Sequence, residues 1–406
     1  MKIKPHYQIL LAIFLGFLAS NIEASSIFIP LGEIFIRLLK MVIVPLVFTS
    51  IVVGISSVAS TVNMGRLGSK TIIYYFSTSL IAILIGLLLA NLVQPGSYFS
   101  LENSSAIQPK ELLETSASFK DLIFRIIPTN PISSLANGDM LSIIFFALFF
   151  GYSMTKIRDE YKVKLNSFMI ALNESIMYLT NLIIKITPIG VFGLIIKAVH
   201  SSSSNIIPSI GVYMLTIFSG LLFHLLFVLP LIFYFFTKIS PIKHYKAVSR
   251  AMLTAFSTSS SSATLPVTLS CVQEEIGVSK STSSFVLPLG ATINMDGTAL
   301  YECAGVLFIS QVLGIDLTIY QQLTVVFTAL LASVGAAGIP SAGLVMIFIV
   351  LQSVGLSDHP QVGIIVGTML AVDRPLDMLR TTINVTSDSI GAVIIAKSEG
   401  EDLYNN

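Results

Sequence analysis

Charged residues are scarce in this chain. Asp, Glu, Lys and Arg make up 11% of its 406 residues, whereas a soluble protein carries about 25%. Hydrophobic residues make up 54%, so the composition predicts a polytopic membrane protein and excludes an ordinary soluble domain. The net charge of +1 gives no sign of a nucleic-acid partner, and the chain has neither a basic tract nor an aromatic RNA-binding motif.

Reactive groups are sparse as well. The two cysteines, Cys271 and Cys303, lack the spacing of metal ligands, and we predict that they are packing residues. The five histidines are scattered and no nucleophile–base pair is visible, so we do not expect an enzyme. The N-terminal run MKIKPHYQILLAIFLGFLAS has no convincing cleavage site, which predicts a first transmembrane helix rather than a removed signal peptide.

Long apolar runs are plentiful in the first half. A helix needs about 20 apolar residues to span a bilayer, and such runs lie at roughly 7–24, 31–58, 70–94, 133–156, 165–198 and 206–237. Lys and Arg gather in one set of loops, at roughly 2–4, 66–70, 156–164 and 238–250, which is predicted to face the cytoplasm. We therefore expect a multi-pass protein of the cell inner or plasma membrane with both termini in the cytoplasm.

The second half contains an internal repeat. Residues 254–266 read TAFSTSSSSATLP and residues 328–340 read TALLASVGAAGIP. We interpret each as a re-entrant helical hairpin followed by one spanning helix, although the first serine run taken alone is also typical of a loop. Irregular backbone at membrane depth is tolerated where it lines a cavity, and two such units form the inverted repeats of secondary transporters. The predicted fold is an all-α polytopic membrane protein with eight transmembrane helices and two re-entrant helical hairpins.

Polar residues gather on one face of the last apolar run. Residues 373–388 read DRPLDMLRTTINVTSD. At 3.6 residues per turn, six polar side chains fall within an arc of roughly 100°: Asp373, Asp377, Arg380, Thr381, Asn384 and Asp388. A charge at the bilayer centre costs about 2.5–3.5 kcal/mol, so this face is predicted to look into a site. Its groups suit a small zwitterionic or anionic solute together with cations.

A second interruption occurs at residues 288–298, which read PLGATINMDGT inside an otherwise apolar span. Glycine destabilises a helix interior by about 1 kcal/mol relative to alanine, and an intramembrane aspartate costs more. An unwound turn would free carbonyls which, with Asn294 and Asp296, form an oxygen-only site suited to Na⁺. The alternative is a kinked helix whose Asp296 is solvated in a cavity.

Two further polar features, one single residue and one helix face, are open to more than one interpretation. Glu302 has no cation nearby in the sequence, so it is predicted to be a proton carrier or, alternatively, a protonated structural residue. Tyr75, Thr78 and Ser79 share one face of the third span. Taken alone, this face indicates ordinary polar contacts between helices.

The motifs SSSSATLP, NMDGT, AAGIP and DMLRTTINVTSD occur in this order at hairpin, broken helix, hairpin and helix. Together they resemble the glutamate/neutral amino-acid transporter family, also called the dicarboxylate/amino acid:cation symporter family, over nearly the whole chain. The resemblance implies a homotrimer in the lipid bilayer that takes up L-aspartate and L-glutamate with Na⁺ and H⁺. It also implies a scaffold domain at 1–69 and 126–204, and a transport domain that moves like an elevator at 70–125 (including an external loop) and 205–406. The second hairpin would act as the outer gate.

The resemblance assigns individual roles as well. Arg380 matches the residue that binds the substrate's side-chain carboxylate, and Asp377 matches the acceptor of its α-ammonium group. The further matched substrate contacts are Ser261, Thr298, Ile339, Gly343, Thr381 and Asn384. Three sodium sites are implied, which we call the first, second and third cation sets: Gly290, Asn294, Asn384 and Asp388; Thr292, Ser333, Val334 and Ala336; and Tyr75, Thr78, Ser79, Asn294 and Asp296.

Some positions separate branches of the family. Glu302 stands where proton-cotransporting, potassium-exchanging animal members have Glu, which implies H⁺ coupling and leaves counter-transport of K⁺ open. Met378 stands where animal members place a second arginine, and Ser259 stands where archaeal members place one, so this chain lacks both. Arg374, just before Pro375, departs from the family pattern and has no assigned role; it either affects the flexibility of Arg380 or packs against the scaffold.

Other functions remain as alternatives. A C4-dicarboxylate:cation symporter would bind a solute without an ammonium group, which would leave Asp377 as a costly unpaired charge. An anion or cation channel is a rival of another class, but two hairpins around one enclosed site favour alternating access. A membrane receptor is disfavoured because the sequence shows no soluble domain.

Overall fold

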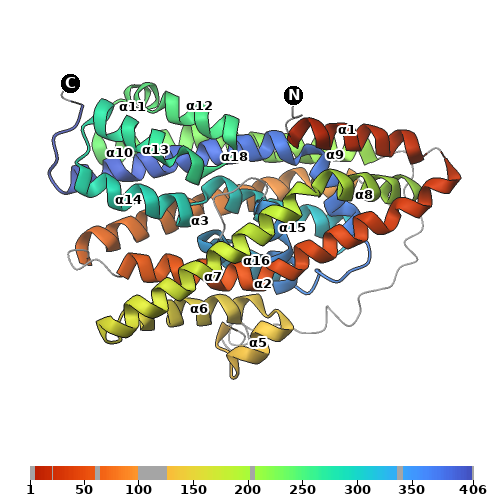
Figure 1. The fold of residues 1–406 in the computed structure, drawn as a ribbon. Coiled ribbons are helices and arrows are strands. Elements are labelled where there is room, and N and C mark those ends of the chain that lie inside the picture. The colour runs from red at the N-terminus through yellow and green to blue at the C-terminus, as the bar shows by residue number, and fades with distance from the viewer. Residues whose placement is uncertain are drawn as a thin grey trace.

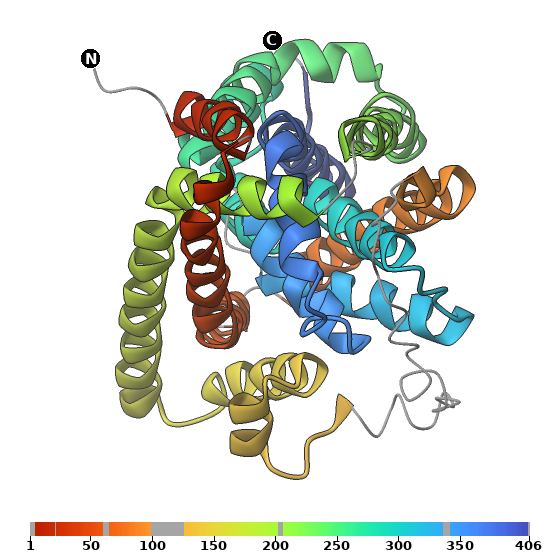
Figure 2. The same cartoon turned by 90° about the vertical axis from the view of Figure 1, so that its right-hand side faces the viewer.

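The computed structural model describes residues 5–20, 22–59, 65–98, 126–201, 206–335 and 342–404. Within these ranges the chain forms helices joined by connections and has no strand, so the all-α prediction is confirmed. The helices form one bundle (Figures 1 and 2), in which the last helix, α18 (Val362–Ser398), lies among the others in both views. Most of its side chains are buried, so its polar residues are placed in the interior.

The runs predicted as spans up to residue 237 form helices of very different lengths. They are α1 (Pro5–Ser20), α2 (Ile29–Ala59), α3 (Gly65–Val93), α5 (Pro131–Asn137), α6 (Met140–Met154), α7 (Asp159–Lys185), α8 (Thr187–Ser201), α9 (Ile206–Phe223) and α10 (Leu229–Thr237). Among the described residues, three helices are long and apolar enough to cross a membrane, at Ala24–Ser56, Arg66–Tyr98 and Ile210–Thr237. A fourth is added if the bent pair Asp159–Ile183 and Thr187–Lys197 is counted as one span. The total of eight spans stays a prediction.

Two predicted spans are each divided into two helices. The run at 165–198 was expected to be one helix, but α7 and α8 meet at a bend of 52°. Pro188 lies in the first turn of α8 and has no N–H to continue the hydrogen-bond ladder of α7. The run at 133–156 is divided at Gly138, which ends α5 with φ +73° before α6 begins. Polar residues mark both breaks, at Lys185 and Thr187 and at 137–139, but the apolar composition of the surrounding runs concealed them.

A helix–turn–helix unit occupies the first predicted hairpin. Helices α12 (Ser249–Thr258) and α13 (Ser261–Ser270) pack against each other. The turn between them is made by Ser259, with φ +51°, and by Ser260, whose side chain accepts a hydrogen bond from the Ala263 N–H at 3.2 Å. Re-entry of this unit into a membrane stays a prediction.

The second predicted hairpin is described in part. Helices α16 (Ile319–Gly335) and α17 (Ala342–Ser353) pack against each other, as the two arms of a hairpin would. The small-residue tip that was predicted between them, at 336–341, lies outside the described residues.

The interrupted span forms two helices, α14 (Lys280–Ile293) and α15 (Asp296–Val312). Asn294 and Met295 between them leave the helical conformation, with φ/ψ of −92°/94° and −122°/52°. The break therefore falls at the NMDGT motif, as the sequence predicts. Cys271 and Cys303 are buried and free, which agrees with their predicted role in packing.

Segments that are far apart in the sequence meet around this break. Helix α15 contacts both α3 and α18, and Figure 2 shows the orange α3 on the same side of the bundle as the cyan helices. A Cβ atom on Gly86 of α3 would lie 2.7 Å from the Leu300 carbonyl oxygen of α15, so glycine permits this close approach. The third span, the broken span and the last helix thus enclose one region of the interior.

Candidate functional site

The polar face of α18 is buried, as predicted. The exposed fractions are 2% for Asp373, 6% for Asp377, 1% for Arg380 and 3% for Asp388. Charged side chains are almost never buried this fully unless they are paired. Each of these groups must therefore have a partner in the interior.

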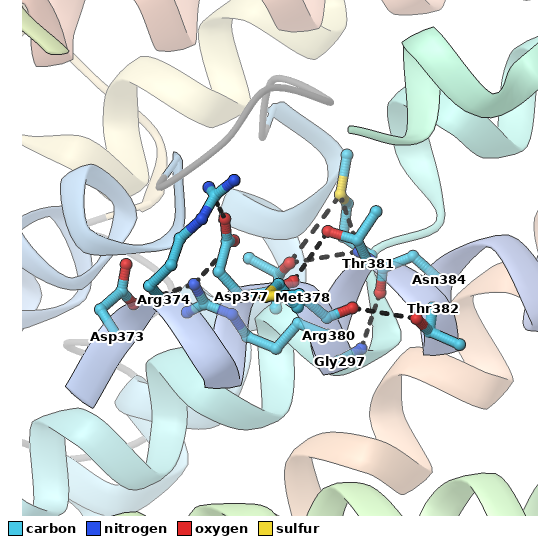
Figure 3. A network of polar contacts seen from close by, with 11 residues as sticks. Gly297, Asp373, Arg374, Asp377, Met378, Arg380, Thr381, Thr382 and Asn384 are labelled. Carbon is cyan, nitrogen blue, oxygen red and sulfur yellow. Dashed lines mark hydrogen bonds and ion pairs between the residues drawn. The ribbon is translucent and has the colours of Figure 1, made fainter. Parts of the chain in front are cut away.

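Arg380 lies at the centre of the charged cluster (Figure 3). Its Nη2 donates to Asp373 Oδ1 at 3.0 Å and to Asp377 Oδ1 at 2.8 Å. Its guanidinium carbon lies 3.8 Å from the ring centroid of Tyr301, in the position of a cation–π contact. Its buried Nε and Nη1 have no hydrogen-bond partner among the described residues. A Cβ on Gly343 would lie 2.7 Å from Nη1, so glycine leaves space beside this nitrogen. The two donor atoms without a described partner suit a planar carboxylate.

Asn384 joins α18 to the start of α15. Its Oδ1 accepts the Gly297 N–H at 2.8 Å, and its Nδ2 donates to Thr298 Oγ1 and Met295 Sδ, both at 3.3 Å. A Cβ on Gly297 would lie 2.8 Å from Arg380 Cα. The N-terminal end of α15 is therefore held directly against the charged part of α18.

The first cation set is assembled around Asp388. Asn294 Nδ2 donates to Asp388 Oδ1 at 2.9 Å, and the Gly290 carbonyl accepts the Asn294 N–H at 2.8 Å. A Cβ on Gly290 would collide with the Asp388 carboxylate and lie 2.5 Å from the Tyr75 hydroxyl. Asn384 lies one helical turn before Asp388. These groups are neighbours, and their binding of sodium stays a prediction.

The third cation set is assembled where the broken span passes from α14 to α15, at Asn294 and Asp296. Ser79 Oγ donates to Asp296 Oδ1 at 2.7 Å, and Thr78 Oγ1 donates to Asn294 Oδ1 at 3.4 Å. The Tyr75 hydroxyl donates to the Val286 carbonyl at 2.8 Å instead of to another member of the set. The hydroxyl face of α3 therefore meets the acidic break between α14 and α15, and sodium binding by this set stays a prediction.

The second cation set is not assembled by any described contact. Thr292 is exposed and Ser333 is buried, and the hydroxyl of each donates to a carbonyl of its own helix, at 2.9 and 2.8 Å. Ala336 lies outside the described residues, as does the predicted substrate contact Ile339, and the side chain of Val334 is not described. This set stays a prediction from the resemblance.

Three other predicted residues lie within these helices. Glu302 on α15 is fully buried, and neither of its carboxyl oxygens has a hydrogen-bond partner among the described residues. Ser261 begins α13 and is buried, and α13 contacts α18. The Thr381 hydroxyl donates to the Asp377 carbonyl at 2.9 Å. The positions are compatible with the predicted roles and do not test them.

Sequence reasoning missed several residues of the cluster. His224 and Asp296 are both fully buried, with His224 Nε2 3.2 Å from Asp296 Oδ2. The single histidine inside an apolar run was the available signal. Tyr301 under Arg380 had no local signal. Arg374, left without a role, places its Nη1 3.5 Å from Asp377 Oδ2, and the i, i+3 spacing was visible in the sequence.

The acidic groups of the cluster are therefore paired with amides, hydroxyls, an imidazole and guanidinium groups. Among the described residues, no three His, Cys, Asp or Glu side chains come close enough together to hold a metal ion. An oxygen-rich arrangement of this kind suits a weakly bound hard cation. It can serve a cation that is transported as cargo.

Comparison with known proteins gives a consistent result. The model of the sodium:dicarboxylate symporter family matches residues 6–398. Excitatory amino acid transporter 3 of Mus musculus is 35% identical over 95% of this chain and 81% of its own length. A proton/sodium-glutamate symport protein of Bacillus caldotenax is 34% identical over 100% of this chain and 96% of its own length. Excitatory amino acid transporter 2 of Homo sapiens is 34% identical over 91% of this chain and 73% of its own length.

Proposed function

Because the chain belongs to the sodium:dicarboxylate symporter family, we propose that it takes up L-aspartate and L-glutamate together with Na⁺ and H⁺. It is then a secondary transporter of the plasma membrane and not an enzyme. The names of relatives that match nearly the whole chain, a proton/sodium-glutamate symport protein and excitatory amino acid transporters, support the substrate class and the coupling ions.

One observation carries the proposal: the same buried face of α18 holds both the charged cluster and two members of the first cation set, Asn384 and Asp388. Arg380 retains two buried donors without a partner among the described residues, and these suit the side-chain carboxylate of the substrate. Asp377 beside it suits the ammonium group, while Thr381, Asn384 and Thr298 offer further polar atoms nearby. An acidic amino acid presents the charges that complement this order.

Sodium coupling follows from the contacts of Asn384. This side chain bonds to Gly297, next to Asp296 of the third cation set, and lies one turn from Asp388 of the first. Buried carboxylates are costly without a compensating cation, so Na⁺ at either set stabilises the break between α14 and α15 in the position that Asn384 requires. Substrate and Na⁺ then favour the same arrangement, which is a coupling free energy between their sites.

We assign the transported proton to Glu302. Its carboxyl group is buried on α15, directly after Tyr301, which packs under Arg380. Carrying a proton lets this side chain cross the membrane without an uncompensated charge. Counter-transport of K⁺ is a finer part of the proposal, and it is tested by varying Na⁺, H⁺ and K⁺ gradients independently and measuring net uptake.

The principal experiment uses purified protein in proteoliposomes. An inward Na⁺ gradient is expected to drive labelled L-aspartate to a concentration above that outside, and an ionophore that collapses the gradient is expected to abolish this accumulation. Equal uptake with and without Na⁺ would contradict the coupling. A current that is independent of substrate, with no concentrative uptake, would indicate a channel instead.

The elevator movement and the homotrimer are also proposals, and one contact offers a test of the movement. Lys40 of α2, in the proposed scaffold, donates to the Ser357 carbonyl at 2.9 Å and pairs with Asp358 at 3.1 Å. These partners lie between α17 and α18, in the proposed transport domain. The pair Lys197–Glu33, at 2.7 Å, joins α8 and α2 within the proposed scaffold.

Cross-linking can compare these two contacts. In a variant with Cys271→Ala and Cys303→Ala, the pair Lys40→Cys and Asp358→Cys is expected to stop uptake when oxidised, and reduction should restore it. The matched control, Glu33→Cys with Lys197→Cys, should keep its uptake when cross-linked. Full uptake with both links formed would exclude movement between the two proposed domains.

A C4-dicarboxylate substrate is the second candidate, because Arg374 lies beside Asp377 and could neutralise it. A solute without an ammonium group would then meet no unpaired charge. Competition of labelled aspartate uptake by succinate decides between the two. We expect L-glutamate to compete far better than succinate, and equal competition would favour the dicarboxylate.

A further inference from the structure

Arg374 contacts the carboxylate to which the proposed function assigns the substrate's ammonium group. Its Nη1 lies 3.5 Å from Asp377 Oδ2, while Asp377 Oδ1 accepts from Arg380 at 2.8 Å. Figure 3 shows the two guanidinium groups reaching Asp377 from different positions on α18. The two oxygens of one carboxylate therefore serve two different cations.

Charge balance in the cluster depends on Arg374. Asp373 and Asp377 both pair with Arg380, through the same Nη2 atom. One guanidinium cannot neutralise two buried carboxylates, so without Arg374 the cluster would carry an excess negative charge away from water. A buried carboxylate that loses its partner is strongly destabilised.

The two arginines are held differently. The Arg380 side chain is 1% exposed, whereas that of Arg374 is 22% exposed. Charge-assisted N–H···O contacts are typically about 2.7–2.9 Å long, so the 3.5 Å contact of Arg374 is loose. Its Nε has no hydrogen-bond partner among the described residues. Arg374 is therefore the member of the cluster that can leave Asp377 and turn toward water.

We propose that Arg374 and the ammonium group of the substrate alternate on Asp377. Arg374 neutralises this carboxylate while the transporter returns without an amino acid, and the incoming ammonium group displaces it. Arg374 is thus a positioning residue that competes with the substrate and does not bind it. This inference rests on the proposed function, since it requires a substrate that carries an ammonium group.

The competition predicts an unusual combination of effects. Removing Arg374 removes a competitor, so the substrate should bind more tightly. It also leaves the charge of Asp377 without full compensation when no amino acid is bound. The movement of the transporter back across the membrane without amino acid should therefore slow. Exchange of external for internal amino acid omits that step and should continue. A merely structural role would weaken binding, exchange and net uptake together.

The experiment compares Arg374→Ala, Arg374→Gln and Arg374→Lys with the wild-type protein in proteoliposomes. Net uptake is driven by an inward Na⁺ gradient, and exchange is measured with aspartate and Na⁺ on both sides. The neutral variants should lower net uptake on the order of tenfold relative to exchange, with a lower Kd for L-aspartate. Arg374→Lys keeps the charge and should restore net uptake. Arg158→Gln, at an exposed arginine before α7, is the matched control and should behave as wild type.

Three outcomes would overturn the inference, and the choice of three variants keeps the test possible if one of them fails to fold. Equal losses of exchange and net uptake, with weaker binding, would make Arg374 structural. If Arg374→Ala fails to fold, Arg374→Gln and Arg374→Lys still provide the charge comparison. If succinate competes with aspartate in the wild-type protein but not in Arg374→Gln, Arg374 remains on Asp377 with ligand bound and does not alternate. Absence of both uptake and exchange in the wild-type protein would defeat the proposed function as well.

Discussion

Helices α7 and α18 are both long and both carry acidic and basic residues, but they place these charges in opposite environments. On α7, Glu160 and Lys164 pair at 2.8 Å with side chains that are 68% and 70% exposed. On α18, Arg380 and Asp377 also pair about one helical turn apart, with side chains that are 1% and 8% exposed. Acidic and basic residues thus form an exposed surface on α7 and a buried site on α18. The difference arises because, of these two helices, only α18 removes its charged side chains from water.

The two helices also differ in how fully their polar groups are satisfied. On α7, Asn173 Oδ1 accepts hydrogen bonds from Thr49 and Ser50, both at 3.0 Å, and Asn166 Oδ1 accepts one from Ser56 at 2.9 Å. Around α18, buried donors of Arg380 and both carboxyl oxygens of Glu302 have no partner among the described residues. Satisfied amides fix helix packing, whereas unsatisfied buried groups are available to substrate and ions.

The largest effect is expected at Arg380. Replacement of Arg380 by Thr removes the proposed partner of a substrate carboxylate and leaves two buried carboxylates, Asp373 and Asp377, without their shared cation. A loss of about 3–5 kcal/mol is typical for such a change, which corresponds to roughly 10²–10⁴ in affinity for acidic substrates. Uptake of serine or alanine should fall much less. Uniform loss across these substrates, measured by competition, would remove the proposed specificity role and weaken the contrast between α18 and α7.

Asp388→Asn is expected to have the next largest effect. The amide keeps the size of the side chain but removes the charge that Asn294 contacts at 2.9 Å. The Na⁺ concentration for half-maximal uptake should rise on the order of tenfold or more, while the pattern of competing substrates should stay unchanged. An unaltered Na⁺ dependence would show that the first cation set does not bind sodium.

Glu302→Gln should change coupling more than binding. The variant keeps a buried polar side chain but cannot carry a proton, so net uptake should lose its dependence on external pH. Exchange should continue, since it does not require release of the proton in each cycle. If the pH profile of net uptake matches that of the wild-type protein, another group carries the proton.

The smallest effect is expected on α7. Lys164→Ala breaks an exposed pair, and exposed pairs contribute only about 0–1 kcal/mol. Thermal stability in detergent and aspartate uptake should both stay close to those of the wild-type protein. A large loss of uptake would mean that charge alone, rather than charge in a buried setting, distinguishes the functional helix.

A partly exposed ion cluster lies just past the end of α18. Glu399 accepts hydrogen bonds from Arg66 and Lys70, and these contacts hold the pKa of Glu399 below its usual value. A carboxylate whose folded-state pKa is lowered contributes its stability above the unfolded pKa, and that contribution disappears as pH falls through the folded pKa. This ion cluster ties the end of α18 to α3 at the rim of the bundle and contributes no group to the site.

The sequence predicted the polar face of α18 and the break between α14 and α15 because both contradict their surroundings. Charges and glycines inside apolar runs are costly, and few arrangements other than a site explain them. The division of α5 from α6 was missed although Gly138 and its polar neighbours mark it, because the apolar run after Asp139 dominates the composition of the whole stretch. The contacts of His224 with Asp296 and of Tyr301 with Arg380 depend on how distant helices pack, and no local pattern encodes that.

The central claim is that one buried face of α18 binds both substrate and cation, so that each favours the other. The most direct measurement is the Kd of L-aspartate for the purified protein over a range of Na⁺ concentrations, with choline replacing Na⁺. The account predicts that Kd falls about tenfold or more for each tenfold rise in Na⁺ below saturation, and that Asp388→Asn flattens this dependence. A Kd that stays constant across the Na⁺ range would contradict it.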